Sequence, residues 1–349
     1  MPPRPAGPGR PEDVTPARPT RPAPVTVPVR LPPGAAPVVV KTLQARRRLA
    51  DRAAGLRRSV GFPWTAPTWP GPVPRPPVEH SLGSEFDTDW ARTPAARAAR
   101  AVILDGVVRP AVGVLASPTI TGTDRLEGLD GPVIFSANHA SHLDTPLLLT
   151  SLPDRFRHKT VVAAGADYFF DRRAKAVASA LVISAIPIDR TSVSRRSLQR
   201  ATDLLEDGWN LVIFPEGGRT PDGWGREFRA GAAFLAVRLG VPIVPVHLEG
   251  TRRVLRKGGG RVRRSSTTVT FGRPIRPADA GGDARALAAS VERAVAVLAD
   301  EQASDWWVAR RRAADGTTPP LRGPDAGSWR RSWALGEGRR RATGPRWPD

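Results

Sequence analysis

The stretch PVIFSANHASHLD, residues 132–144, contains the change of pattern that decides the fold. Residues 132–136 form an apolar run that is typical of a buried strand. Polar groups follow, and then residues 141–151 form a second apolar segment that predicts a helix. The turn between a strand and the next helix is where α/β sheets place their ligands. We therefore expect the polar residues between the two segments to lie at a functional edge of a sheet.

The same alternation of β-rich runs and helical segments continues along the chain and predicts an α/β fold. Further strands are expected at residues 160–163, 186–188, 210–214, 242–247 and 268–271. Helices are expected at residues 95–116, 172–184, 194–206, 229–239 and 283–299. Gly208 and Gly240 each follow a predicted helix end, where a residue in the left-handed conformation belongs. No internal repeat is visible.

The composition divides the chain into three parts. Residues 1–77 hold 20 of the 38 prolines, so residues 1–92 are expected to be a largely disordered, proline- and arginine-rich extension, with room for a short basic helix at 41–58. Residues 93–302 form the expected folded domain. Residues 303–349 are expected to be a second disordered extension, an Arg/Trp-rich tail that holds five of the ten tryptophans and ten arginines. Such a tail suits either a membrane–water interface or docking on its own domain, and base stacking is a weaker third interpretation.

The net charge of +20 predicts an anionic partner. Arginine supplies nearly all of it, since lysine occurs only at positions 41, 159, 175 and 257. A basic field attracts nucleic acid, anionic lipid headgroups or phosphorylated substrates, and the planar guanidinium suits bidentate contact with phosphate. A general bias of the sequence toward arginine, alanine, proline and glycine explains part of this charge, mainly in the two tails.

The chain contains no cysteine, which excludes a disulfide scaffold, a thiol nucleophile and thiolate metal sites. The uncharged runs are shorter than the ~18 apolar residues of a membrane-spanning helix. The first residues, MPPRP, lack the apolar core of a signal peptide. We therefore expect a cytoplasmic protein that is peripheral on the inner face of the cell membrane.

His139 and Asp144 are the first candidates for chemistry. Ser141 and Asp144 have the spacing of a capping box, in which the hydroxyl accepts from a helix N–H and the carboxylate faces back. One turn into the helix, Asp144 could also accept from one imidazole nitrogen of His139. The other nitrogen would then be a proton acceptor in a fixed tautomer, as a general base requires. Seen alone, the pair is equally compatible with a plain helix cap and a histidine that only satisfies a loop carbonyl.

A metal site made of His139, His142 and Asp144 is the alternative use of this segment. No cluster of acidic or histidine residues elsewhere in the sequence supports it, so we expect no metal.

Three other segments follow in order. FPEGGR, residues 214–219, places two glycines and Arg219 after a predicted strand, where backbone N–H groups and a guanidinium can hold an anion. Arg226 and Arg229 precede or open the next helix, whose N-terminus favours anions. SAIPIDR, residues 184–190, is a short strand that ends in Arg190, and VPIVPV, residues 241–246, is an apolar run with two prolines. Each of these has a plain structural interpretation when it is taken alone.

Together and in this order, the four segments resemble the glycerolipid acyltransferase superfamily, over roughly residues 115–275. That family carries an N-H-x-x-x-x-D block, a strand block ending in arginine, an F-P-E-G-x-R block and a V-P-I-V-P-V-type block. Ser184 stands where the family usually has glycine, and Gly218 where it usually has threonine. The resemblance implies a single α/β domain with a mixed sheet flanked by helices, as in glycerolphosphate acyltransferases.

The resemblance also implies residue roles. His139 would be the base that deprotonates the acceptor hydroxyl, and Asp144 would orient it. The residues implied to hold the acceptor's phosphate and glycerol are Asn138, Ser141, Arg190, Glu216, Gly217, Gly218 and Arg219. The residues implied to border the acyl chain are Val241, Pro242, Ile243 and Val244.

The expected function is acyl transfer from acyl-CoA or acyl carrier protein, as co-substrate, to 1-acylglycerol-3-phosphate or a related lysophospholipid. No further cofactor is expected. Glycerol-3-phosphate or another lipid acceptor is the nearest alternative. A basic nucleic-acid-binding protein explains the charge but not the four ordered segments, so no nucleic acid is expected as a partner. A hydrolase would need a nucleophilic serine, and no G-x-S-x-G motif is present.

Overall fold

A computed structural model of the chain describes residues 83, 85–189, 195–219, 222–256, 261–323 and 331, with backbone only at 195 and 196. The chain divides into two units, Met1–Pro77 and Val78–Asp349, and all described residues belong to the second. The helix expected at 41–58 and the proline-rich extension before residue 83 lie outside the described residues, as does Arg190.

A seven-stranded sheet forms the centre of the second unit, in the order β1-β7-β6-β2-β5-β3-β4. All neighbouring strands are parallel except β6 and β7, so the sheet is mixed, as expected. The strands are β1 (Pro118–Thr121), β2 (Ile134–Ala137), β3 (Thr160–Gly165), β4 (Ala185–Ile188), β5 (Asn210–Ile213), β6 (Ile243–Glu249) and β7 (Thr267–Phe271). Six of them lie within two residues of the predicted ranges. The edge strand β1 was not predicted, because it is short and mostly exposed and so lacks an apolar alternation.

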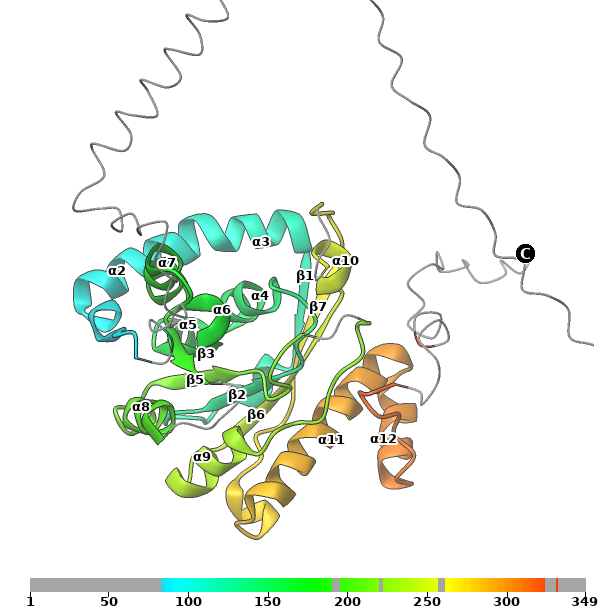
Figure 1. Cartoon of the computed structure of the whole chain (residues 1–349). Helices are drawn as coiled ribbons and strands as arrows, with labels where there is room; N and C mark the ends of the chain where they lie inside the picture. The colour runs from blue at the N-terminus through cyan, green and yellow to red at the C-terminus, as the bar shows by residue number, and fades with distance from the viewer. Residues whose placement is uncertain are drawn as a thin grey trace, which may run out of the picture. The chain divides into compact units, whose positions relative to one another are not determined.

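Helices cover both faces of this sheet (Figure 1). The α-helices are α2 (Pro94–Ile103), α3 (Arg109–Ala116), α4 (Asp144–Ser151), α5 (Asp154–Arg157), α6 (Ala166–Phe169), α7 (Arg173–Ile183), α8 (Arg195–Glu206), α9 (Gly231–Leu239), α10 (Thr251–Val254), α11 (Ala284–Ala303) and α12 (Trp306–Ala314). The shorter turns are η1 (Asp89–Arg92), η2 (Leu104–Val108), η3 (Thr123–Leu126) and η4 (Pro277–Ala280). The single helix expected at 95–116 is interrupted by η2, a π turn that precedes Pro110.

Two apolar layers hold the helices on the sheet. Phe135 on β2 faces one layer, with residues of α3 and α4, whereas its neighbour Ile134 faces the other, with residues of α8, α9 and α11. This is the alternation expected along a strand that is buried on both faces. Gly208 and Gly240 have φ values of 75° and 68° and follow α8 and α9, which confirms both predicted caps.

The described part of the C-terminal region is folded. Its helix α12 packs against α11, buries Ala309 and pairs Arg312 with Asp300 at 2.6 Å. Trp306 and Trp307 remain 46% and 74% exposed. Among the described residues, no helix combines the length and the apolar character needed to cross a bilayer.

Candidate active site

The His139–Asp144 pair forms at the carboxyl end of β2. Asp144 Oδ2 accepts from His139 Nδ1 at 2.9 Å and from the backbone N–H groups of Ala140 and Ser141 at 2.7 and 2.8 Å. The carboxylate of Asp144 is fully buried, whereas the imidazole of His139 keeps 15% of its surface exposed. Because an ionised carboxylate only accepts, Nδ1 carries the proton and Nε2 is left as the basic nitrogen.

The predicted capping box forms only in part. Ser141 donates its backbone N–H to Asp144, as expected, but its hydroxyl accepts from Leu143 N at 3.1 Å and donates to the Leu255 carbonyl at 2.7 Å. Helix α4 therefore begins at Asp144 and not at 141. Buried and bonded on both sides, Ser141 ties the turn to α10 and has no surface for a substrate.

Asn138 also has a structural role. Its side-chain amide donates to the Leu248 carbonyl at 2.9 Å and accepts from the Leu248 N–H at 2.7 Å. These two bonds fasten the end of β2 to β6, so the turn that carries His139 leaves the sheet at a fixed position.

Phe214 and Glu216, which follow the neighbouring strand β5, contact His139. The imidazole stacks on the Phe214 ring with centroids 4.2 Å apart and planes 23° apart. The His139 backbone N–H donates to Glu216 Oε1 at 2.9 Å, and Arg226 N–H donates to Glu216 Oε2 at 3.2 Å. Glu216 is only 2% exposed, so the side chain expected to bind the acceptor is engaged by two backbone groups.

Burial raises the pKa of Glu216 from 4.5 to about 7. The folded protein therefore keeps a proton that the unfolded chain releases between these two pH values, and the free energy of unfolding falls as the pH rises from 4.5 to 7. We expect this loss to be on the order of 3 kcal/mol.

The Glu216→Gln variant isolates this contribution, because burial lowers the pKa of both His142 and His247 to about 4 and gives a pH dependence of opposite sign. Urea denaturation of wild type and variant from pH 4.5 to 8 measures the difference. A difference that stays constant with pH would contradict a buried, protonated Glu216.

An apolar cavity of about 160 Å³ opens beside His139. It is lined by the carboxyl ends of β3, β4 and β5, by Phe169 and by Gly217 and Gly218. Gly217 has φ 70°, and a Cβ there would lie 2.8 Å from Arg229 Cζ, so the loop needs glycine for the arginine to approach. Arg229 also lines the cavity. The structure thus brings His139, both glycines and Arg229 to one hollow.

Val241, Pro242, Ile243 and Val244, the residues expected to border the acyl chain, are not among the residues that line this cavity. Val241, Ile243 and Val244 are at most 6% exposed, and Ile243 and Val244 lie in β6 between β2 and β7. Their apolar pattern reflects a central strand that is buried on both faces. The residues that do line the hollow were missed, because Val162, Ile183 and Ile213 carry no signal beyond ordinary core composition.

His142 does not join the pair, although it lines the same cavity as His139. Its Nε2 lies 2.9 Å from the hydroxyl of Tyr168, whose ring it stacks on, and Lys175 Nζ lies 3.6 Å from that ring centroid. Burial, with Arg219 close by, lowers the pKa of His142 to about 4. In the described part of the chain, no three His, Cys, Asp or Glu side chains gather in a way that could hold a metal ion.

Comparison with known proteins gives one family. The model of the Acyltransferase family matches residues 117–249. A 1-acyl-sn-glycerol-3-phosphate acyltransferase of Chlamydomonas reinhardtii is 31% identical over 54% of this chain and 57% of its own length. The chloroplastic BAT2 enzyme of the same name from Brassica napus is 27% identical over 45% and 44%. The chain spans about half the length of these curated relatives.

A solved structure, the 1-acyl-sn-glycerophosphate acyltransferase PlsC from Thermotoga maritima, is 23% identical over 60% of this chain and 81% of its own, with a TM-score of 0.46. The family match spans β1 to β6 and contains both His139 and the FPEGGR loop. Residues 117–249 of this chain are therefore similar to the Acyltransferase family.

Proposed function

We propose that this protein transfers a fatty acyl chain from a thioester donor to the free hydroxyl of 1-acylglycerol-3-phosphate. The observation that carries the proposal is the His139–Asp144 pair, with its basic nitrogen beside a cavity and next to the FPEGGR loop. The curated relatives, which are named for this reaction, support the choice of acceptor.

The chemistry begins with proton abstraction. His139 Nε2 takes the proton of the acceptor hydroxyl as the oxygen attacks the thioester carbonyl, and Asp144 stabilises the imidazolium that forms. The tetrahedral adduct then collapses, the C–S bond breaks, and the thiolate leaves and takes the proton from His139. The products are an ester and a free thiol. Direct transfer of this kind needs no acyl-enzyme, which agrees with a chain that contains no cysteine.

The cavity beside His139 supports a corrected position for the acyl chain. Its walls include Val162, Ile183 and Ile213, together with Phe169. An apolar hollow within reach of the basic nitrogen suits the carbons next to the reacting carbonyl. We place the acyl chain there and not along residues 241–244.

Purified protein, labelled acyl-CoA or acyl carrier protein, and a panel of acceptors test the reaction. We expect transfer to 1-acylglycerol-3-phosphate and less to glycerol-3-phosphate or neutral lysolipids.

Arg219→Ala should raise the KM of the phosphate-bearing acceptor about tenfold, through loss of one charge-assisted contact. Arg238→Ala, at the far end of α9, is the control. An unchanged KM in Arg219→Ala would remove Arg219 from the phosphate site.

We also propose that the protein is peripheral on an anionic membrane, at the inner face of the cell membrane. The +20 charge, the exposed Trp306 and Trp307, and the exposed Val102 and Val107 support it. Flotation with anionic vesicles at physiological salt tests it. Protein that stays at the bottom of the gradient would contradict it.

A further inference from the structure

Residues 222–229 connect the FPEGGR loop to helix α9, and residues from the C-terminal end of the described chain contact them. The backbone N–H of Gly225 donates to the Leu321 carbonyl at 2.9 Å. Leu321 also packs against the apolar layer shared by α9 and α11. A loop near the catalytic turn is thus fastened by a segment that begins after α12.

A second contact lies a few residues earlier in the loop. Arg331 Nε donates to Asp222 Oδ2 at 2.9 Å, and its carbonyl accepts from Trp224 Nε1 at 3.0 Å. Both charged side chains are less than one-third exposed, so solvent screens the pair less than it would a surface pair. We call residues 321–323 together with Arg331 the C-terminal clasp.

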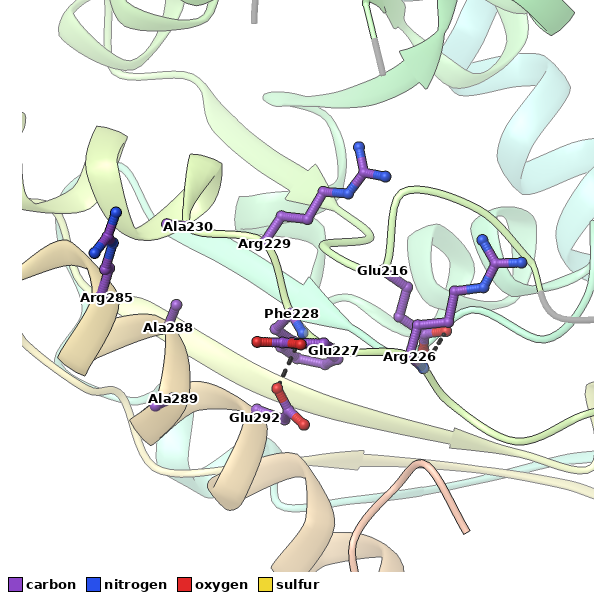
Figure 2. A pocket seen from close by; sticks show the side chains of 10 residues that line it. All are labelled: Glu216, Arg226, Glu227, Phe228, Arg229, Ala230, Arg285, Ala288, Ala289 and Glu292. Carbon is purple, nitrogen blue, oxygen red and sulfur yellow. Dashed lines mark hydrogen bonds between the residues drawn. The ribbon is translucent and has the colours of Figure 1, made fainter. Parts of the chain in front are cut away.

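Glu292 on α11 contacts both the loop and the clasp. The backbone N–H of Phe228 donates to Glu292 Oε2 at 3.0 Å, a bond drawn in Figure 2. The other carboxylate oxygen of Glu292 lies 3.6 Å from Arg322 Nε. One carboxylate oxygen of Glu292 therefore accepts a hydrogen bond from the loop, and the other pairs with Arg322 of the clasp. Both segments are thus attached to α11.

A short series of bonds links this loop to His139. Gly225, which the clasp holds, is followed by Arg226, whose N–H donates to Glu216 Oε2. The other oxygen of Glu216 accepts from the backbone of His139. Figure 2 shows Glu216 and Arg226 side by side at one end of the pocket that also holds Glu292. One peptide unit and three hydrogen bonds thus connect Leu321 to the catalytic turn.

We infer that the C-terminal clasp is a positioning element for the acyl-transfer site, acting through residues 222–226 and Glu216 on His139. The inference rests on the proposed function for its kinetic consequence. Misplacement of a catalytic group by about 1 Å can cost about 10²-fold in rate. Release of the clasp should therefore lower kcat while the unfolding midpoint of the domain stays nearly the same.

The chain offers a matched pair of glycines for the test. Gly323 in the clasp and Gly316 after α12 have φ values of 70° and 69°, so alanine meets about the same backbone strain at each. A Cβ at Gly323 would overlap the indole of Trp224, whereas a Cβ at Gly316 meets nothing within 4 Å. Only Gly323→Ala pushes the clasp away from the loop.

We expect Gly323→Ala to lower kcat about tenfold relative to Gly316→Ala, with the KM of the acyl donor unchanged and unfolding midpoints that agree. In the Glu216→Gln background the effect of Gly323→Ala on kcat should largely disappear, because the same connection is already altered. Arg331→Ala should act in the same direction, and Arg331→Lys should restore most of the rate. If Gly323→Ala does not fold, the comparison of Arg331→Ala with Arg331→Lys tests the inference instead.

Limited trypsin digestion gives a readout that is independent of the reaction. The loop contains Arg226 and Arg229, and cleavage there should be about tenfold faster in Gly323→Ala than in Gly316→Ala. Equal cleavage rates and equal kcat values in the two glycine variants would overturn the inference. A wild-type protein that transfers no acyl chain to any acceptor would instead refute the proposed function, and the digestion would still test the clasp.

Discussion

Replacement of His139 by alanine is expected to lower kcat for acyl transfer by about 10²- to 10⁴-fold, the contribution typical of a positioned general base. The variant should remain folded, because the His139 backbone N–H still donates to Glu216 and Asp144 still accepts from Ala140 and Ser141, although the ring contact with Phe214 and the Nδ1 bond to Asp144 are lost. Kinetics with labelled donor, together with circular dichroism and a thermal melt, measure both quantities.

His158→Ala is the matched control for this experiment. His158 is also half-buried and lies 3.4 Å from a carboxylate, that of Asp105, but it lines no part of the described cavity. Its loss should leave kcat within twofold of wild type. Retained activity in His139→Ala would require another base and would remove the central residue of the proposed mechanism.

Asp144→Asn is expected to lower kcat by up to about 10⁴-fold, the loss that follows neutralisation of the orienting aspartate in a Ser-His-Asp triad. The amide oxygen can still accept from the N–H groups of Ala140 and Ser141, so the turn should keep its shape. The same oxygen position also accepts from His139 Nδ1, but an uncharged amide stabilises the imidazolium that forms on His139 much less than a carboxylate does.

Asp154→Asn is the control, because Asp154 opens the next helix, α5, and pairs with Arg157 while it is 77% exposed. An unchanged kcat in Asp144→Asn would show that Asp144 only holds the turn before α4.

The order of strands and helices could be predicted because the centre of the sheet is apolar on both faces. Ile134 and Phe135 pack into opposite layers, and each strand of this kind ends in a polar turn that the sequence marks. The His139–Asp144 contact was predictable because the two residues are only five positions apart, so it requires no contact between distant parts of the chain.

Features that depend on distant contacts were not predictable. The role of Glu216 depends on a hydrogen bond to His139, which lies 77 positions away. The sequence FPEGGR is equally compatible with a loop that binds substrate and with one that only supports the turn of His139. The apolar run at 241–244 predicts burial but does not distinguish a groove wall from a central strand. The clasp joins Trp224 and Arg331 across 107 positions, with no pattern in either segment that indicates the other.

The two hydrogen bonds between Asn138 and Leu248 join residues 110 positions apart. Contacts between residues so far apart in the sequence form slowly, because a large loop of chain must be closed. The catalytic turn therefore cannot reach its final position in a folding intermediate that lacks β6. Recovered acyl transfer would consequently report completion of the sheet, whereas recovered helix content would report only earlier and more local events.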